Sequence, residues 1–185
     1  MIAPRQLTAS VELRISALDD AAAIADAQVR SREHLRPWEP ARTEHWFTTA
    51  GQLERLVYQL DRYKTGHAVP WVLAEGSRIV GAITLSDLVP GPFRSASLGY
   101  WLAPEVLGRG LATLAVEAVA SISDQELKLH RIEASTLTGN VASQRVLERT
   151  GFHQIGMAPT YLHIDGSWQD CNLYQRILNS RAPGA

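Results

Sequence analysis

Gly108, Arg109 and Gly110 stand where a short strand-like run and a loop lead into a helical pattern. Glycine lets backbone amides approach a ligand closely, and the first turn of a helix offers unpartnered N–H groups beside the positive end of the helix dipole. This combination suits a bound diphosphate, although it also fits an ordinary turn before a structural helix. It is not a Walker loop, because no Gly-Lys-Ser/Thr follows. Nor is it the full dinucleotide fingerprint, because Thr113 occupies the third glycine position.

A second polar pair, Asn140 and Ser143, opens a later helical pattern in the string NVAS. Residues three apart lie on the same helix face, so the two side chains can serve one site. Asn140 is also a favoured N-cap residue, and Ser143 also fits a cap or a small packing residue. The six histidines have no spacing that indicates a metal site, so no metal is expected.

Periodic placement of apolar residues predicts the elements that position these groups. Strands are expected at 11–18, 71–74, 78–85, 97–102, 131–136, 161–164 and 168–177. Helices are expected at about 20–32, 49–63, 110–122 and 140–149. Asp19 and Asp20 are candidate caps of the first helix, Gly66 is the expected end of the second, and Asp165-Gly166 marks the last hairpin. This order predicts a mixed α/β or α+β architecture around one sheet, rather than an alternating doubly wound fold.

Length and composition limit the classes of function. The 185 residues fit one domain, and the 45% apolar and 20% charged residues are ordinary for a soluble globular protein. A net charge of -1 gives no electrostatic footprint for nucleic acid or an anionic membrane. The single cysteine, Cys171, excludes an internal disulfide. No apolar run is long enough to span a membrane, and the start lacks the apolar stretch of a secretory signal, so a cytoplasmic location is expected.

Two strings, Gly99 to Thr113 and Asn140 to Phe152, resemble the GNAT acetyltransferase superfamily, and specifically its RimJ/RimL branch of ribosomal-protein N-terminal acetyltransferases. The LRPWEP loop around Trp38 and the last hairpin are also similar to this branch, whereas Leu107 departs from the superfamily pattern. The resemblance implies a single mixed, mostly antiparallel sheet of about six or seven strands flanked by about four helices. It implies one domain over 1–185, with a core at about 11–178 and a short flexible C-terminal tail.

The resemblance also implies acetyl-CoA as the acyl donor and assigns residues to it. The backbone near Trp101 and Leu102 is expected to pair with the pantetheine arm and to polarise the thioester carbonyl. Asn140 is expected to bond a pantetheine amide, and Ser143 to act near the sulfur. The amides expected at the pyrophosphate belong to Leu107, Gly108, Arg109, Gly110, Leu111 and Ala112.

Candidate catalytic groups follow from the same resemblance. Where many members of the superfamily carry a tyrosine, this chain has Leu147, and Ser143 is the candidate to orient or relay a proton to the leaving thiolate. Glu39 is the first candidate for the base that deprotonates the amine, and Glu133 is the second. Trp38 and Asp170 are candidate contacts of the substrate.

The expected function is transfer of acetyl to the N-terminal α-amino group of a protein, such as a ribosomal protein, by direct attack on the thioester. One alternative is acetylation of a small amine such as a polyamine, an amino sugar or an antibiotic. Another is a non-catalytic acyl-CoA-binding protein. Nucleic acid and membrane are not expected as partners, and a homodimer is left open.

Overall fold

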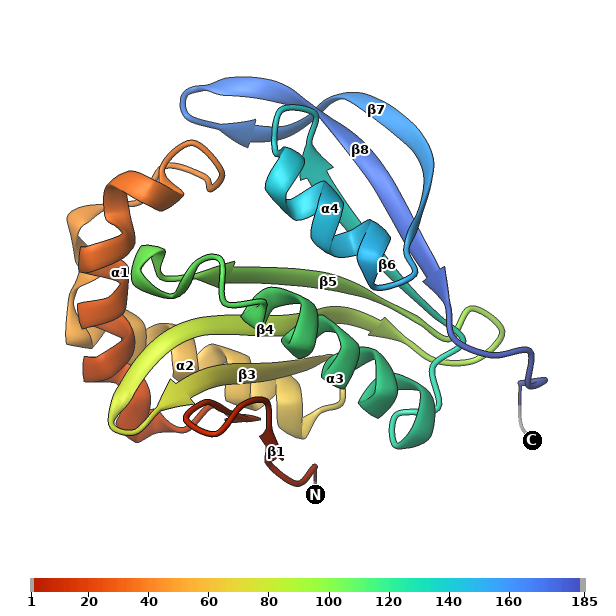
Figure 1. Cartoon of the computed structure of the whole chain (residues 1–185), viewed down its shortest axis with the longest axis horizontal. Coiled ribbons are helices and arrows are strands. Elements are labelled where there is room, and N and C mark those ends of the chain that lie inside the picture. Colours follow the sequence, from red (N-terminus) through yellow and green to blue (C-terminus); the bar gives the residue numbers. More distant parts are fainter. Residues whose placement is uncertain (1, 184–185) are drawn as a thin grey trace.

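The computed structural model describes residues 2–183 and contains four α-helices and eight strands in one sheet (Figure 1). The strands are β1 (Arg5–Gln6), β2 (Glu12–Ile15), β3 (Ala68–Glu75), β4 (Arg78–Val89), β5 (Ser95–Leu102), β6 (Arg131–Leu137), β7 (His153–Ile164) and β8 (Ser167–Ile177). The helices are α1 (Ala21–Leu35), α2 (Thr49–Lys64), α3 (Leu111–Gln125) and α4 (Val141–Arg149), with short 3₁₀ turns η1 (Leu18–Asp20), η2 (Glu44–Phe47) and η3 (Pro104–Val106).

The sheet has the order β1-β2-β3-β4-β5-β6-β8-β7, and every neighbouring pair is antiparallel except β5 and β6. The predicted mixed, mostly antiparallel sheet with four helices is therefore confirmed. The two-residue strand β1 was not predicted, because two residues are too few to show an alternating pattern.

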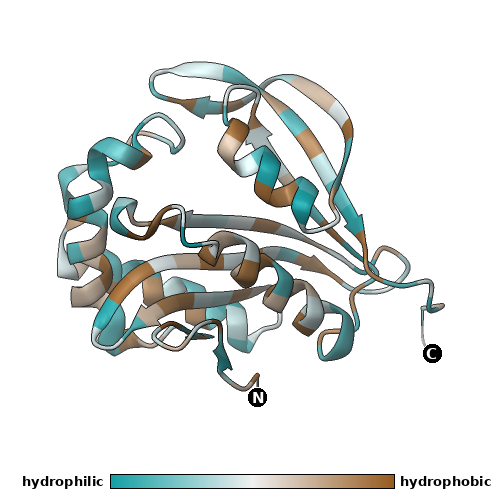
Figure 2. Cartoon of the chain, in the orientation of Figure 1, coloured by the Kyte–Doolittle hydropathy of each residue, from teal (hydrophilic) through white to brown (hydrophobic). Residues whose placement is uncertain are grey.

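Helices cover both faces of the sheet, because strands such as β3 carry apolar side chains on both faces. The side chains of β3 alternate between two cores, as the strand period of two requires. Val69, Trp71 and Leu73 belong to the larger core, which includes the buried face of α3. Val72 and Ala74 belong to a smaller core with residues of α1 and α2. In Figure 2 hydrophobic residues, drawn in brown, occur along the middle strands and along α3, which pack against each other.

The parallel pair β5 and β6 is hydrogen-bonded over only three residues on each strand. Ser95–Ser97 pairs with Arg131–Glu133, and no further register follows. Both strands nevertheless continue, β5 bonded to β4 as far as Leu102 and β6 bonded to β8 as far as Leu137. The facing edges of β5 and β6 therefore diverge into a V that leaves the middle of the sheet open on one side (Figure 1).

Most predicted helix ends are confirmed, but the proposed cap of α1 is wrong. Gly66 and Gly151, which follow α2 and α4, have φ of +75°. The carboxylate of Asp20 does not cap α1. It accepts hydrogen bonds from Arg14 at 2.6 and 2.8 Å and from the amide of Ala17 at 2.7 Å. The Asp20 side chain therefore forms an ion pair with Arg14 of β2 instead of capping the free amides of α1.

The last hairpin is longer than its sequence indicates. Asp165 and Gly166 form the predicted turn, with φ of 49° and 82°. However, β7 begins at His153 rather than at residue 161. Pro159 lies beside a register shift between Ala158 and Leu162, and this irregularity hides the first half of the strand from pattern analysis. Within residues 2–183, no helix is long and apolar enough to cross a membrane.

Candidate active site

A cavity of about 390 Å³ fills the V between β5 and β6. Leu98–Leu102 and Ala134–Leu137, the parts of the two strands that do not pair with each other, form its two long walls. The end of α1, the loop after it, α4 and the last hairpin close the remaining sides. Each long wall carries one strand edge without a partner strand, so the cavity is lined by backbone groups suited to an extended ligand that contains amides.

The loop before α3 presents a row of free donors at one side of this cavity. From Gly108 to Thr113, six successive backbone amides donate to no acceptor among residues 2–183. Gly108 and Gly110 have φ of +75° and +74°, and a Cβ added to either would meet no atom within 4 Å. The positive φ favours glycine at both positions, and the space beside each of their Cα atoms is open. Free amides with open space beside them suit a diphosphate.

Side chains hold this loop from outside. The guanidinium of Arg109 donates to Glu75 at 2.7 Å and to the Ser10 hydroxyl at 3.4 Å. The side chain of Arg109 thus turns toward the β3–β4 hairpin, and only its backbone faces the row of donors. Leu107 and Ala112, on either side of the glycines, line the cavity itself.

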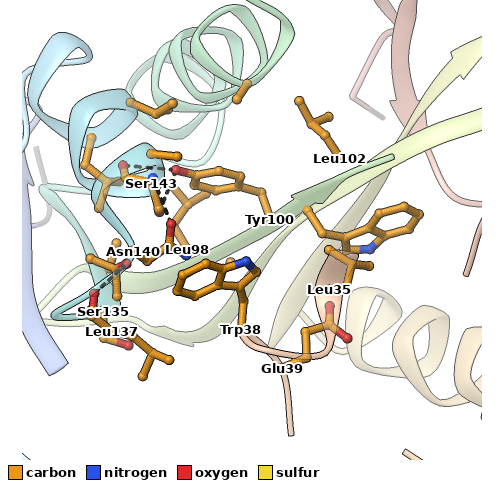
Figure 3. Close-up of a pocket in the computed structure, with 18 of the residues that line it drawn as sticks. Leu35, Trp38, Glu39, Leu98, Tyr100, Leu102, Ser135, Leu137, Asn140 and Ser143 are labelled. Carbon is orange, nitrogen blue, oxygen red and sulfur yellow. Dashed lines mark hydrogen bonds between the residues drawn. The ribbon is translucent and has the colours of Figure 1, made fainter. Parts of the chain in front are cut away.

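Asn140, Ser143 and Tyr100 form a hydrogen-bonded group in the cavity wall (Figure 3). Asn140 caps α4 through its Oδ1, which accepts from the Ser143 amide at 3.1 Å, while its Nδ2 has no acceptor in the described part of the chain. The hydroxyls of Ser143 and Tyr100 lie 2.9 Å apart. Burial raises the pKa of Tyr100 to about 12, against the hydrogen bond with Ser143, so the phenol stays protonated at neutral pH.

Glu39 lines the same cavity from the loop after α1, next to Trp38 (Figure 3). Burial raises the pKa of the Glu39 carboxyl, and the charges of Arg42 and Arg55 only partly offset this effect. The Arg42 Nε lies 3.8 Å from the carboxylate. A carboxyl with a raised pKa is a stronger base when ionised, which suits proton abstraction.

Glu133 and Asp170 lie away from both this cavity and the loop before α3. Glu133 lies in the paired part of β6, opposite Ser97, and forms an ion pair with Arg131 at 3.0 Å. Asp170 accepts from the Thr160 amide at 2.8 Å and so ties the last hairpin together. The remaining predicted residues line the cavity or belong to the loop before α3 and the first turn of α3: Trp38, Glu39, Trp101, Leu102, Leu107, Gly108, Arg109, Gly110, Leu111, Ala112, Asn140 and Ser143.

Sequence reasoning missed Tyr100, His34 and Ser135, which also line the cavity. Tyr100 stands in the string Gly99 to Thr113, directly before the predicted contacts Trp101 and Leu102, and this place could have drawn attention to it. No three His, Cys, Asp or Glu side chains of residues 2–183 gather into a group that could hold a metal ion.

Comparison with known proteins gives consistent matches over nearly the whole chain. A family model of the GNAT acetyltransferase domain matches residues 11–153. The [ribosomal protein uS5]-alanine N-acetyltransferase of Escherichia coli is 33% identical over 167 residues, which are 89% of this chain and 86% of that protein. The crystal structure of ribosomal-protein-S5-alanine acetyltransferase from Vibrio fischeri superimposes with a TM-score of 0.94 at 31% identity, covering 98% of this chain and 100% of that chain. Mycobacterium smegmatis RimJ in complex with CoA-disulfide gives a TM-score of 0.87 at 30% identity, covering 90% and 81%.

Proposed function

The chain belongs to the GNAT acetyltransferase family, and from this premise we propose that it transfers acetyl from acetyl-CoA to the N-terminal α-amino group of a protein, such as a ribosomal protein. The observation that carries the proposal is the row of free amides from Gly108 to Thr113 beside the open V of the sheet. The Escherichia coli and Vibrio fischeri relatives are named for the alanine of a ribosomal protein, and they suggest the class of acceptor.

The residues present fit coenzyme A along its length. The amides of the loop before α3 are placed to bind its diphosphate, which needs several donors and a positive helix end. The free edges of β5 and β6 are placed to bond the amides of the pantetheine arm as an added strand does. The unpartnered Nδ2 of Asn140 offers one further donor. Backbone near Trp101 and Leu102 then lies beside the thioester carbonyl.

Glu39 is the proposed base. An N-terminal amine has a pKa of about 8, whereas a lysine side chain has one of about 10.4, so the α-amine is the easier nitrogen to deprotonate near neutral pH. Glu39 lines the cavity beside Trp38, and the pKa of its carboxyl is raised by burial. It takes a proton from the nitrogen, directly or through water, as the C–N bond forms.

Ser143 and Tyr100 are proposed to meet the departing sulfur. When the C–S bond breaks, the sulfur keeps the electron pair and needs a hydrogen-bond donor or a proton. The Ser143 hydroxyl can donate to it while accepting from Tyr100, 2.9 Å away. Because burial raises the pKa of Tyr100, its phenol stays protonated, and the Tyr100 hydroxyl serves as a fixed donor that polarises the Ser143 hydroxyl.

A thiol-release assay with acetyl-CoA tests the proposal. The acceptors are short peptides with different first residues, each with one internal lysine, beside spermidine and an aminoglycoside. We expect thiol release with peptides, and fragment masses that place the acetyl group on the α-amine. Turnover of only the small amines contradicts the proposed acceptor, and tight binding of acetyl-CoA without any turnover contradicts the enzymatic role.

A further inference from the structure

A second cavity, of about 160 Å³, adjoins the first at Leu35 and Glu39, which line both. We name this second cavity the arginine pocket, because three arginines contribute to its wall. They are Arg32 from the last turn of α1, Arg36 directly after that helix, and Arg42 from the following loop. An amine that is deprotonated by Glu39 therefore has the arginine pocket immediately beside it.

Two of these arginines are held in place by aromatic rings of η2. The guanidinium of Arg42 lies over the Trp46 ring at 3.8 Å, and that of Arg32 lies over the Phe47 ring at 4.4 Å. Stacking occupies the face of a guanidinium and leaves its N–H groups free at the edge. The arginine pocket is thus preorganised by cation–π contacts.

Buried glutamines fix Trp46 in turn. The Trp46 Nε1 donates to Gln28 Oε1 at 3.1 Å, and Gln52 Nε2 donates to the Trp46 carbonyl at 2.6 Å. Gln28 is 3% exposed and Gln52 is 0% exposed. Buried, hydrogen-bonded side chains of this kind support the ring on which Arg42 stacks.

Two guanidinium groups of the arginine pocket have no close acceptor. Within the described residues, the only ion pairs of Arg36 and Arg42 are long, 3.6 Å to Glu33 and 3.8 Å to Glu39. Arg32 is better satisfied, since it bonds both oxygens of Glu44 at 2.5 and 3.1 Å.

A fourth arginine, Arg55, lies behind the arginine pocket. Its guanidinium lies 5.3 Å from the Trp46 ring, on which Arg42 also stacks. Burial and the charge of Arg42 lower the pKa of Arg55 to about 10, although Glu39 opposes this shift. Glu39 and Asp165 are the two carboxylates in the wall of the arginine pocket, and Glu33 and Glu44 face Arg36 and Arg32 from outside it. What the pocket offers is therefore unused guanidinium donors.

We propose that the arginine pocket binds an acidic side chain, aspartate or glutamate, at the second or third residue of the acceptor peptide. This inference rests on the proposed function, because it places the peptide's α-amine at Glu39. An extended peptide advances about 3.3–3.6 Å per residue, so residues two and three fall within the neighbouring cavity. A carboxylate there receives charge-assisted hydrogen bonds from Arg36 and Arg42, whose donors lack close acceptors.

Peptide competition tests the subsite. Three peptides are identical at the first residue and from the fourth residue onward. They differ only in carrying glutamate, glutamine or lysine at both the second and the third positions. We expect kcat/KM to be about tenfold higher for the glutamate peptide than for the glutamine peptide, the size typical of a charge-assisted hydrogen bond, and lowest for the lysine peptide. The preference should weaken as salt is raised.

Charge reversal supplies the matched variants. Arg36→Glu should remove the preference for glutamate and favour the lysine peptide, and Arg36→Gln should abolish the preference without inverting it. Arg62→Glu is the control, because Arg62 pairs with Asp87 and lines neither cavity. It should leave the order of the three peptides unchanged.

The outcomes separate the two proposals. Equal kcat/KM for the three peptides, or an equal loss for all of them in Arg36→Glu, overturns the acidic subsite while N-terminal acetylation stands. If none of the peptides is acetylated but spermidine is, the proposed function fails and the subsite fails with it.

Discussion

At the scale of single residues, burial raises the pKa of the Glu39 carboxyl and the charge of Arg42 opposes this effect. Arg42 lies 3.8 Å from the carboxylate and lowers its pKa, against the larger effect of burial. Arg42→Gln removes the opposing charge, so the pKa of Glu39 should rise further. Because the base must be ionised, the acid limb of the kcat/KM profile should move to higher pH, which a pH series measures directly.

Glu39→Gln is the companion variant. It should lower kcat by about 10²–10⁴-fold, the usual contribution of a general base. An unchanged rate for Glu39→Gln, or an acid limb that stays in place in Arg42→Gln, would show that another group takes the proton.

The hydroxyl pair of Tyr100 and Ser143 makes a second prediction. Tyr100→Phe keeps the ring and removes only the group that lies 2.9 Å from Ser143. We expect a lower kcat with little change in the KM for acetyl-CoA, and an effect much smaller than additive when Ser143→Ala is combined with it. Steady-state kinetics of the two single variants and the double variant give the coupling.

A change of leaving group provides the control. The leaving group of p-nitrophenyl acetate is a stable anion that needs less help from a hydrogen-bond donor, so Tyr100→Phe should lose less activity with this ester than with acetyl-CoA. If activity falls by the same factor with both acyl donors, the two hydroxyls have a structural role and do not assist departure of the sulfur.

The sequence pointed to Ser143, Asn140 and Glu39, because each stands in a recognisable string. Tyr100 also stands in such a string, Gly99 to Thr113, but the string does not show which group its hydroxyl contacts. Its partner Ser143 is 43 residues away along the chain, and only the divergence of β5 from β6 brings the two hydroxyls together. Glu133 has a suitable residue type, but its place in the paired part of β6 keeps it from the cavity.

At the scale of elements, the loop before α3 depends on the left-handed backbone of Gly110. Gly110→Trp places an indole in the open space in front of the free amides, so acetyl-CoA affinity, measured by calorimetry, should fall at least 100-fold. Gly66→Trp is the matched control, since Gly66 has φ of +75°, also has no atom within 4 Å of an added Cβ, and lines neither cavity described above. Equal affinities in the two variants would contradict the placement of the diphosphate.

The ion pair of Asp20 and Arg14 joins the start of α1 to β2. The Asp20 side chain is 9% exposed. Burial opposes ionisation, but bonds from Arg14 and the Ala17 amide outweigh it and lower the pKa of the carboxyl. Asp20→Asn leaves Arg14 partly buried without a counter-charge, so urea unfolding should show a loss of about 3 kcal/mol.

The exposed pair of Asp26 and Arg30 gives the control, because Asp26 is 69% exposed and Asp26→Asn should cost under about 0.5 kcal/mol of unfolding free energy.

The direction in which stability changes with pH follows from the lowered pKa of Asp20. Its contribution is present above the pKa of the unfolded chain and is lost as pH falls through the lower value of the folded protein. A wild-type-like midpoint for Asp20→Asn would contradict this assignment.

Helices and turns were largely predictable from sequence, because their causes are local. The period of α2, the end at Gly66 and the Asp165-Gly166 turn depend on neighbouring residues. The first half of β7 was not predictable, since Pro159 and a register shift interrupt its alternation. The predicted cap of α1 was wrong for a different reason, because Arg14 on β2 forms an ion pair with the Asp20 side chain.

At the scale of the whole molecule, the open V between β5 and β6 creates the site. The sequence of each strand predicts an ordinary strand, but neither sequence indicates that the pairing of β5 with β6 stops after three residues. The divergence is a property of the assembled sheet, in which β4 and β8 hold β5 and β6 on their outer edges. Resemblance to a family could suggest this architecture, but composition and periodicity could not.

The most direct test of the account is a crystal structure of this chain with coenzyme A. We expect diphosphate oxygens at about 3 Å from amides between Gly108 and Thr113, and the pantetheine arm between the free edges of β5 and β6. Coenzyme A bound at another surface, or in the V with its diphosphate away from these amides, would contradict the central claim.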